Sequence, residues 1–150
     1  MSANTVKLHR VLRSKPERVY RAFLDPDALV KWLAPYGFTA RVHEMESRVG
    51  GSYRMSFTNF TTGASHSFGG KYLELVPNER IRYTDRFENP GLPGEMQTTV
   101  VIEAVPVGVE LSITQEGLPE AIALEACYLG WQESLALLAK LVEPEIADGM

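Results

Sequence analysis

The sequence predicts an α+β fold in which one curved antiparallel sheet of about seven strands wraps around a long C-terminal helix. Three observations support this prediction. Apolar residues alternate with a period of two from Phe38 to Glu116, two short segments with helical spacing precede this region, and one apolar helical stripe follows it. Since the 150 residues contain no linker, repeat or low-complexity tract, we expect residues 1–150 to form a single domain.

The N-terminal part is expected to form a half-buried strand over 4–13 and then two short helices. Ser14 is expected to cap the first helix, with Glu17 completing a capping box. The second helix begins at Asp25-Pro26 and ends before Pro35. This part therefore predicts a strand followed by two helices.

Six further strands are expected over 38–46, 52–60, 66–76, 80–88, 96–105 and 110–116. Turn-forming residues such as Gly50-Gly51 and Asn89-Pro90-Gly91 separate them, and such short connections favour an antiparallel meander. Gly69-Gly70 lies inside a predicted strand, which indicates a bulge or a close backbone approach and not a break.

The last segment predicts a helix from Pro119 to about Val142. Its apolar residues recur at spacings of four and three: Leu124, Tyr128, Trp131, Leu135, Leu138 and Val142. A helix of about 20 residues is ~30 Å long. Only the sheet offers a large enough surface to cover this stripe, so the helix should lie in the concave face of the sheet.

An internal cavity is indicated by three polar residues that continue the apolar face of their strands, namely Asn59, Asp85 and Gln115. A buried polar group without a partner costs roughly 1–3 kcal/mol, so these side chains should pair, meet water or meet a ligand. Strand ends also approach solvent, and a slip of one residue would turn these side chains outward. The candidate cavity-lining residues are Trp32, Phe38, Tyr53, Met55, Phe57, Asn59, Tyr83, Asp85, Phe87, Gln115, Leu124, Tyr128 and Trp131.

Metal and cofactor chemistry is not indicated. His9, His43 and His66 lack the spacing of a metal site, and the sequence has no nucleophile elbow, phosphate loop or dinucleotide fingerprint. The single cysteine, Cys127, allows no intramolecular disulfide and is expected to be a small core residue. We therefore expect no metal and no cofactor.

Catalysis is an open alternative that depends on one carboxyl group. Asp85 is the carboxylate that we consider as an acid or base. Burial beside Tyr83 would raise its pKa, whereas Arg82 or Arg86 would lower it. The sequence leaves this balance open, and we assign no catalytic residue.

Net charge and hydropathy indicate which classes of partner and which cellular location to expect. The net charge of -4 gives no broad attraction to nucleic acid phosphates. No apolar run approaches the ~20 residues of a membrane span, and the N-terminus lacks an apolar signal segment. We expect a cytoplasmic protein that binds no nucleic acid and does not insert into membranes. An exposed sheet edge leaves a homodimer open.

Five segments, in order along the chain, resemble the SRPBCC superfamily of START-like, pollen-allergen-like helix-grip proteins. Within it, the chain is similar to the family named for homology to the activator of the heat-shock-protein-90 ATPase. The matching segments are 14–23, 31–35, 48–53, 70–81 and Gly130-Trp131. The resemblance implies a helix-grip fold with an internal cavity.

The resemblance implies less about function, because fold does not fix function. Its relatives bind lipids, hormones or polyketides, some cyclise or aromatise polyketides, and the eponymous protein stimulates a chaperone. The family has no universal catalytic set, and fold maintenance is the expected role of the matching Trp32, Glu74 and Trp131. The chain lacks the separate N-terminal domain of the eponymous activator, which argues against chaperone stimulation.

Three functions therefore compete. The favoured one is non-enzymatic binding of a small hydrophobic molecule, lipid-like or aromatic and polyketide-like, by a carrier, sensor or sequestering protein. The second is a polyketide cyclase or aromatase that works in the same cavity with Asp85 or a tyrosine hydroxyl moving protons. The third is a partner-binding module that contacts a chaperone through the outer face of the sheet.

Overall fold

A computed structural model describes residues 4–149 of the chain and shows the predicted order of elements. Its elements are β1 (Val6–Leu12), α1 (Pro16–Leu24), α2 (Pro26–Trp32), β2 (Phe38–Met45), β3 (Ser52–Asn59), β4 (Ser65–Val76), β5 (Arg80–Phe87), β6 (Met96–Val105), β7 (Gly108–Glu116) and α3 (Leu124–Val142). The period-two alternation thus predicted every strand between Phe38 and Glu116.

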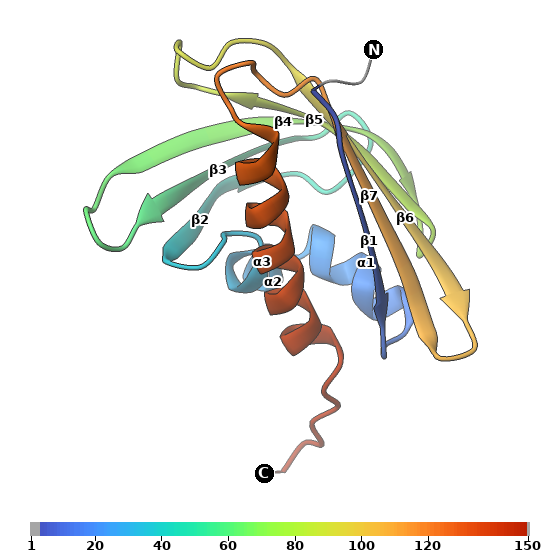
Figure 1. Cartoon of the computed structure of the whole chain (residues 1–150). Helices are drawn as coiled ribbons and strands as arrows, with labels where there is room; N and C mark the ends of the chain where they lie inside the picture. Colours follow the sequence, from blue (N-terminus) through green and yellow to red (C-terminus); the bar gives the residue numbers. More distant parts are fainter. Residues whose placement is uncertain (1–3, 150) are drawn as a thin grey trace.

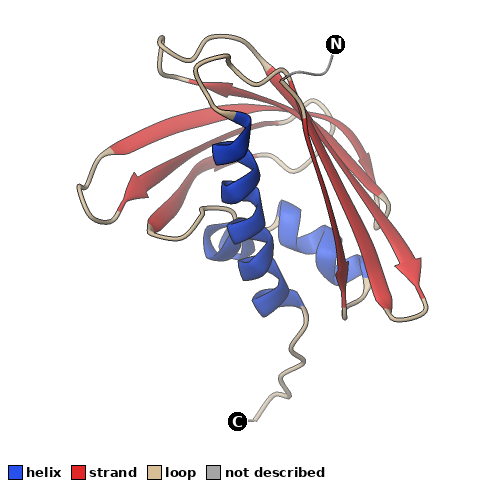
Figure 2. Ribbon diagram, in the orientation of Figure 1, coloured by secondary structure: helices blue, strands red, loops and turns tan. Residues whose placement is uncertain are grey.

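The seven strands form one antiparallel sheet in the order β1-β7-β6-β5-β4-β3-β2. Strands β2 to β7 form a meander in which each strand pairs with its neighbours in sequence. Strand β1 is an edge strand and pairs with β7. The sheet curls around α3, which crosses its concave side, while α1 and α2 lie together near one end (Figure 1). The view by secondary structure shows the same arrangement, with the helices on one side of the sheet (Figure 2). The predicted helix-grip fold is confirmed.

The apolar core lies between the concave face of the sheet and the helices. Inward residues of β7, such as Leu111 and Ile113, are almost fully buried, as are Leu135 and Leu138 of α3. Outward residues carry charge and form exposed ion pairs, for example Arg54 with Glu88. The alternation seen in the sequence therefore separates a buried face from a solvated face of each strand.

The helix starts differ from the prediction at two places. Ser14 does not cap α1, since Lys15 occupies the N-cap without a side-chain bond. The Ser14 hydroxyl instead donates to the carbonyl oxygen of Val142 at 2.8 Å, in the last turn of α3, where carbonyls lack helical partners. The last helix starts at Leu124, because the segment after Pro119 forms a turn.

Gly69 and Gly70 fill the role that their position predicted. A Cβ atom at Gly69 would overlap the carbonyl oxygen of Tyr53, and one at Gly70 would overlap that of Thr84. Neighbouring backbones therefore approach β4 too closely for a side chain at either position. The shift in the β4–β5 register lies further along, between Tyr72 and Glu74.

Candidate functional site

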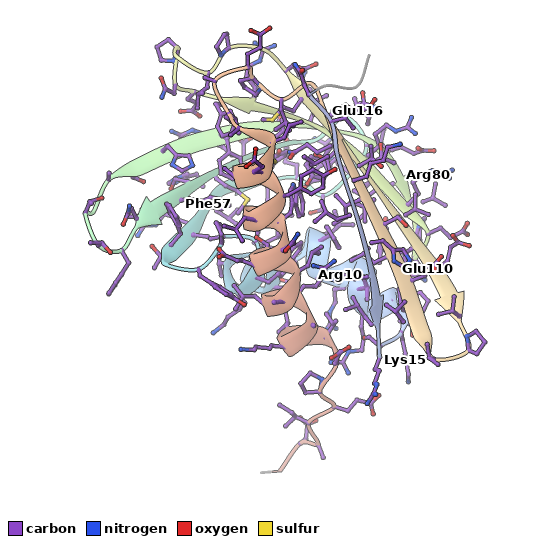
Figure 3. All side chains as sticks on the ribbon, in the orientation of Figure 1. Arg10, Lys15, Phe57, Arg80, Glu110 and Glu116 are labelled. Atoms are coloured by element: carbon purple, nitrogen blue, oxygen red, sulfur yellow. The ribbon has the colours of Figure 1, made fainter. Side chains whose placement is uncertain are left out.

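A cavity of about 290 Å³ lies between the strands β3, β4 and β5, the two short helices and α3. Its wall is mostly apolar and aromatic. Phe57 of β3 belongs to this wall, on the side of the sheet that carries α3, whereas Arg80 lies beyond the strands on the other side of the sheet (Figure 3). A cavity of this kind with a few polar groups has the usual form of a small-molecule site.

The structure brings eight of the thirteen candidate residues to the cavity wall. These are Tyr53, Met55, Phe57, Tyr83, Asp85, Phe87, Gln115 and Trp131. Six of the eight come from β3 and β5, where alternate residues share the inward face.

Three aromatic candidates lie outside the wall. Trp32 is 0% exposed, packs edge-on against Phe23 with ring centroids 4.7 Å apart, and donates from Nε1 to the carbonyl oxygen of Ala22. It joins α1 to α2. Phe38 lies near the His66 ring at the end of β2, and the Tyr128 hydroxyl accepts from the backbone N–H of Lys7.

The other two candidates outside the wall have local roles. The Asn59 side chain accepts from the backbone N–H groups of Thr61 and Thr62, so it stabilises the β3–β4 turn. Leu124 lies half-buried at the start of α3 and packs against the core. Residue type alone did not distinguish these positions from true wall positions.

The wall also contains residues that were not predicted. Phe68 and Tyr72 of β4 have the same inward parity as the wall residues of β3. Their signal was hidden by Gly69-Gly70, which interrupts the apolar alternation. The remaining additions include Phe23, Leu29, Leu33, Pro35, His66, Met96, Leu118, Ile122, Ala126, Cys127, Gly130 and Ser134.

The aromatic rings of the wall contact one another mostly edge to face. The Phe57 and Phe68 ring centroids lie 4.8 Å apart at 74°, and those of Tyr53 and Tyr83 lie 5.8 Å apart at 89°. Tyr72 completes a group of three tyrosines, 5.7 Å from Tyr53. Such pairs are favourable and hold each ring in place, so the wall keeps its shape around the empty space.

Asp85 is the carboxyl group of this wall. The Tyr53 hydroxyl lies 2.7 Å from Asp85 Oδ1 and 3.1 Å from the carbonyl oxygen of Thr84. Tyr53 pairs with Gly70, which lies on the strand between Tyr53 and Asp85. Because Gly70 has no side chain, the Tyr53 ring can cross β4 and reach β5.

Burial decides the protonation of Asp85. Removal from water raises the pKa of Asp85 from 3.8 to about 7, against the smaller opposing effects of the Tyr53 hydroxyl and the Arg86 N–H. Burial, and then the charge of Asp85, also raise the pKa of Tyr53 and of Tyr83. The tyrosines thus remain hydroxyl donors at neutral pH, while Asp85 changes charge near neutrality.

Gln115 forms the second polar position. Its Oε1 accepts from Trp131 Nε1 at 2.9 Å and from Cys127 Sγ at 3.5 Å. Burial raises the pKa of the Cys127 thiol to about 11, so this cysteine carries its proton at neutral pH. It lines the cavity, where a core position was expected.

Two further observations concern metal ions and membranes. Among residues 4–149, no three His, Cys, Asp or Glu side chains are grouped so that they could hold a metal ion. In the same part of the chain, no helix has the length and apolar character needed to cross a membrane. The wall itself offers apolar rings for contact, groups that donate and accept hydrogen bonds, and one carboxyl group, that of Asp85, whose pKa lies near neutrality.

Known proteins show the same fold. The chain resembles a crystal structure from Chromobacterium violaceum at 62% identity and a TM-score of 0.94, covering 95% of this chain and 99% of that one. A crystal structure from Rhodobacter sphaeroides follows at 23% identity and a TM-score of 0.79, covering 91% and 90%.

A third structure, the solution structure of an AHSA1-like protein from Aeromonas hydrophila, has 18% identity and a TM-score of 0.76, covering 93% and 92%. A comparison with curated proteins gave no match. The family described as activator of Hsp90 ATPase homolog 1-like protein matches residues 13–143 of the chain. The match spans most of the chain and agrees with the fold, so this protein belongs to the activator of Hsp90 ATPase homolog 1-like family, within the SRPBCC superfamily.

Proposed function

We propose that this protein, acting as a single helix-grip domain in the cytoplasm, binds a small hydrophobic molecule in its internal cavity as a carrier, sensor or sequestering protein. The observation that carries the proposal is the cavity of about 290 Å³ with its wall of aromatic side chains. An empty apolar space costs stability because its lining loses contacts, and a bound apolar molecule would restore them.

Gly130 gives the proposal a direct test. It lies in the first half of α3 and lines the cavity, and a Cβ atom at this position would meet no atom within 4 Å. Gly130→Phe should therefore place a ring in the cavity without a backbone clash. Leu129→Phe is the matched control, because Leu129 is the preceding residue on α3 and 57% exposed.

The first measurement is native mass spectrometry of freshly purified protein, with identification of any molecule that is released on denaturation. The proposal expects a stoichiometric apolar molecule on the wild type and on Leu129→Phe, and a loss on Gly130→Phe. Where the wild type is purified empty, naphthalene is titrated against the same three proteins. Equal binding by a folded Gly130→Phe variant would contradict the proposal.

A polyketide cyclase or aromatase is the second candidate, and the environment of Asp85 favours it. A carboxyl group with a pKa of about 7 beside a tyrosine hydroxyl, in an apolar cavity, suits general acid–base catalysis. Asp85→Asn should keep binding and lose turnover of a poly-β-ketone substrate if Asp85 moves protons. Unchanged turnover would remove Asp85 from the mechanism.

The chaperone-binding alternative rests on the family name. It would use the outer face of the sheet, where Arg54 pairs with Glu88 and Arg80 with Glu74. Recovery of a chaperone in a pull-down, equally by the wild type and by Gly130→Phe, would favour it over cavity binding.

A further inference from the structure

Two polar groups in the cavity wall have hydrogen-bonding capacity that the described residues do not use. They are the side-chain amide of Gln115 and the carboxyl group of Asp85, which lie on different strands of the same cavity. Because a ligand in an apolar cavity is oriented by its few polar contacts, these two groups indicate the chemistry of the ligand.

The orientation of the Gln115 amide is fixed by its neighbour. The indole Nε1 of Trp131 can only donate, so the amide oxygen of Gln115 must face it. The amide nitrogen, with its two N–H donors, therefore points away from Trp131. The Gln115 residue is only 7% exposed, and within residues 4–149 this nitrogen has no hydrogen-bond acceptor. A ligand oxygen that accepts a hydrogen bond would satisfy it.

The hydrogen bonds that Asp85 can still form depend on the Tyr53 hydroxyl. This hydroxyl has one proton, and two acceptors lie within hydrogen-bond distance of it: Asp85 Oδ1 and the carbonyl oxygen of Thr84. When Asp85 is ionised, Tyr53 can serve only one of them. When Asp85 is protonated, it can donate to Tyr53 while Tyr53 donates to Thr84, so both contacts become hydrogen bonds. In both states the carboxyl group retains lone pairs that can accept from a ligand.

The sheet register places the two groups on the same inward face of the sheet, with strand β6 between them. Asp85 pairs with Met96 on β6, and Gln115 pairs with Thr98 on the other side of that strand. The two residues are therefore two strands and two residues apart, which corresponds to roughly 12 Å between Cα atoms. A flat molecule of two fused rings, with polar substituents at opposite ends, matches this separation once the side chains reach inward.

We propose that the cavity binds a flat apolar ligand in one orientation, with a carbonyl-type oxygen accepting from the Gln115 amide nitrogen and a hydroxyl or N–H group donating to Asp85. This inference rests on the proposed ligand-binding function and specifies the class of ligand. Other titratable side chains that face Asp85 or the cavity are the hydroxyls of Tyr53, Tyr72 and Tyr83, the ring of His66 and the thiol of Cys127.

Four naphthalenes test the inference: naphthalene, 2-naphthol, 2-acetylnaphthalene and 6-acetyl-2-naphthol. Their dissociation constants are measured by naphthyl fluorescence on the wild type. Each polar substituent should strengthen binding about five- to tenfold relative to naphthalene, so that 6-acetyl-2-naphthol binds most tightly.

Two variants assign the contacts. Asp85→Leu leaves the Tyr53 hydroxyl bonded to Thr84 and should abolish the gain from the hydroxyl group only. Gln115→Met keeps the side-chain length and should abolish the gain from the acetyl group only. Since every gain is a ratio to naphthalene on the same variant, a general change in the cavity cancels. Gln115→Glu, which keeps an oxygen for Trp131, replaces the methionine variant if that variant does not fold.

The outcomes separate the inference from the proposed function. Equal affinity of the wild type for all four naphthalenes would leave the proposed function standing and overturn the oriented binding. Gains that persist in both variants would overturn the assignment to Asp85 and Gln115. A folded wild type that binds none of the four would overturn the proposed function and this inference together.

Discussion

The two halves of the concave face differ in the side chains that they carry. The half formed by β1, β6 and β7 is mostly aliphatic: Val6, Leu8, Val100, Ile102, Val109, Leu111 and Ile113 are all buried there. The half formed by β3, β4 and β5 is mostly aromatic: Tyr53, Phe57, Phe68, Tyr72, Tyr83 and Phe87 face the cavity. The aliphatic half packs closely in the core, whereas the aromatic half forms most of the cavity wall.

The helices explain this difference. Helix α1 approaches β6 and helix α3 approaches β1, so branched aliphatic side chains meet apolar partners and pack closely. On the other half, large rings lean on one another edge to face and keep the wall rigid without a helix against it. The comparison shows that the closely packed core and the cavity wall are supplied mainly by different strands of one sheet.

The largest effect is expected in the aliphatic half. Ile113 is 0% exposed, and Ile113→Ala should lower the free energy of unfolding by about 4 kcal/mol, from lost transfer energy and the new void. Urea denaturation measures this change. The control Val107→Ala lies at an exposed turn and should change stability by less than about 0.5 kcal/mol. A loss under about 1 kcal/mol at Ile113 would mean that this half is not closely packed.

The second-largest expected effect is a pH-dependent change in stability caused by Asp85 in the cavity wall. Since burial raises the pKa of Asp85 from 3.8 to about 7, the folded state binds more protons than the unfolded state between these values. The stability contributed by Asp85 is thus complete below pH 3.8 and is lost as the pH rises through 7. Because Asp85 remains partly open to the cavity, we expect a loss of roughly 2–3 kcal/mol.

Urea denaturation at several pH values, compared between the wild type and Asp85→Asn, measures this loss. The variant cannot ionise at this position, so its stability should change less over the same pH range. A wild type and variant with parallel pH profiles would show that Asp85 is well solvated.

The sequence predicted the fold because each helix and each strand shows a single apolar periodicity along its length. Counting alternate residues along β3 and β5 also placed Tyr53, Tyr83 and Asp85 on the inward face. The same counting indicates that two arginines of β5 do not face Asp85. Arg82 and Arg86 lie at odd distances from it along the strand, so their side chains lie on the outer face, away from the cavity.

The remaining site features depend on contacts between distant segments. A tryptophan in a core and a tryptophan in a cavity wall have the same local pattern, so Trp32 and Trp131 could not be separated. Ser14 carried a capping signal, but its hydroxyl donates to the carbonyl oxygen of Val142, 128 residues away in the sequence. Neither outcome is encoded within a few residues of the position concerned.

A third prediction contrasts the wall with the packed half directly. Phe87 is half-buried, lines the cavity and contacts Phe68 at a ring-centroid distance of 6.4 Å. Phe87→Ala should cost about 1–2 kcal/mol, less than the 3–5 kcal/mol typical of a closely packed phenylalanine, because one side of the ring already faces the cavity and has fewer packing contacts there. Urea denaturation gives the stability, and a cost equal to that of Ile113→Ala would contradict the distinction between the halves.

The smallest effect separates stability from binding at one residue. Glycine in a helix interior is less stable than alanine by roughly 0.5–1 kcal/mol, and Gly130 has room for a methyl group. Gly130→Ala should therefore stabilise the protein by about this amount and, because the methyl group enters the cavity, weaken binding of naphthalene. Gly63→Ala is the control, since its φ of 77° disfavours any side chain and should lower stability. A Gly130→Ala variant that gains stability and binds as tightly as the wild type would show that ligands do not reach this part of α3. The expected opposite shifts would instead show that the glycine in the first half of α3 lowers the stability of the helix and leaves room for a ligand in the cavity.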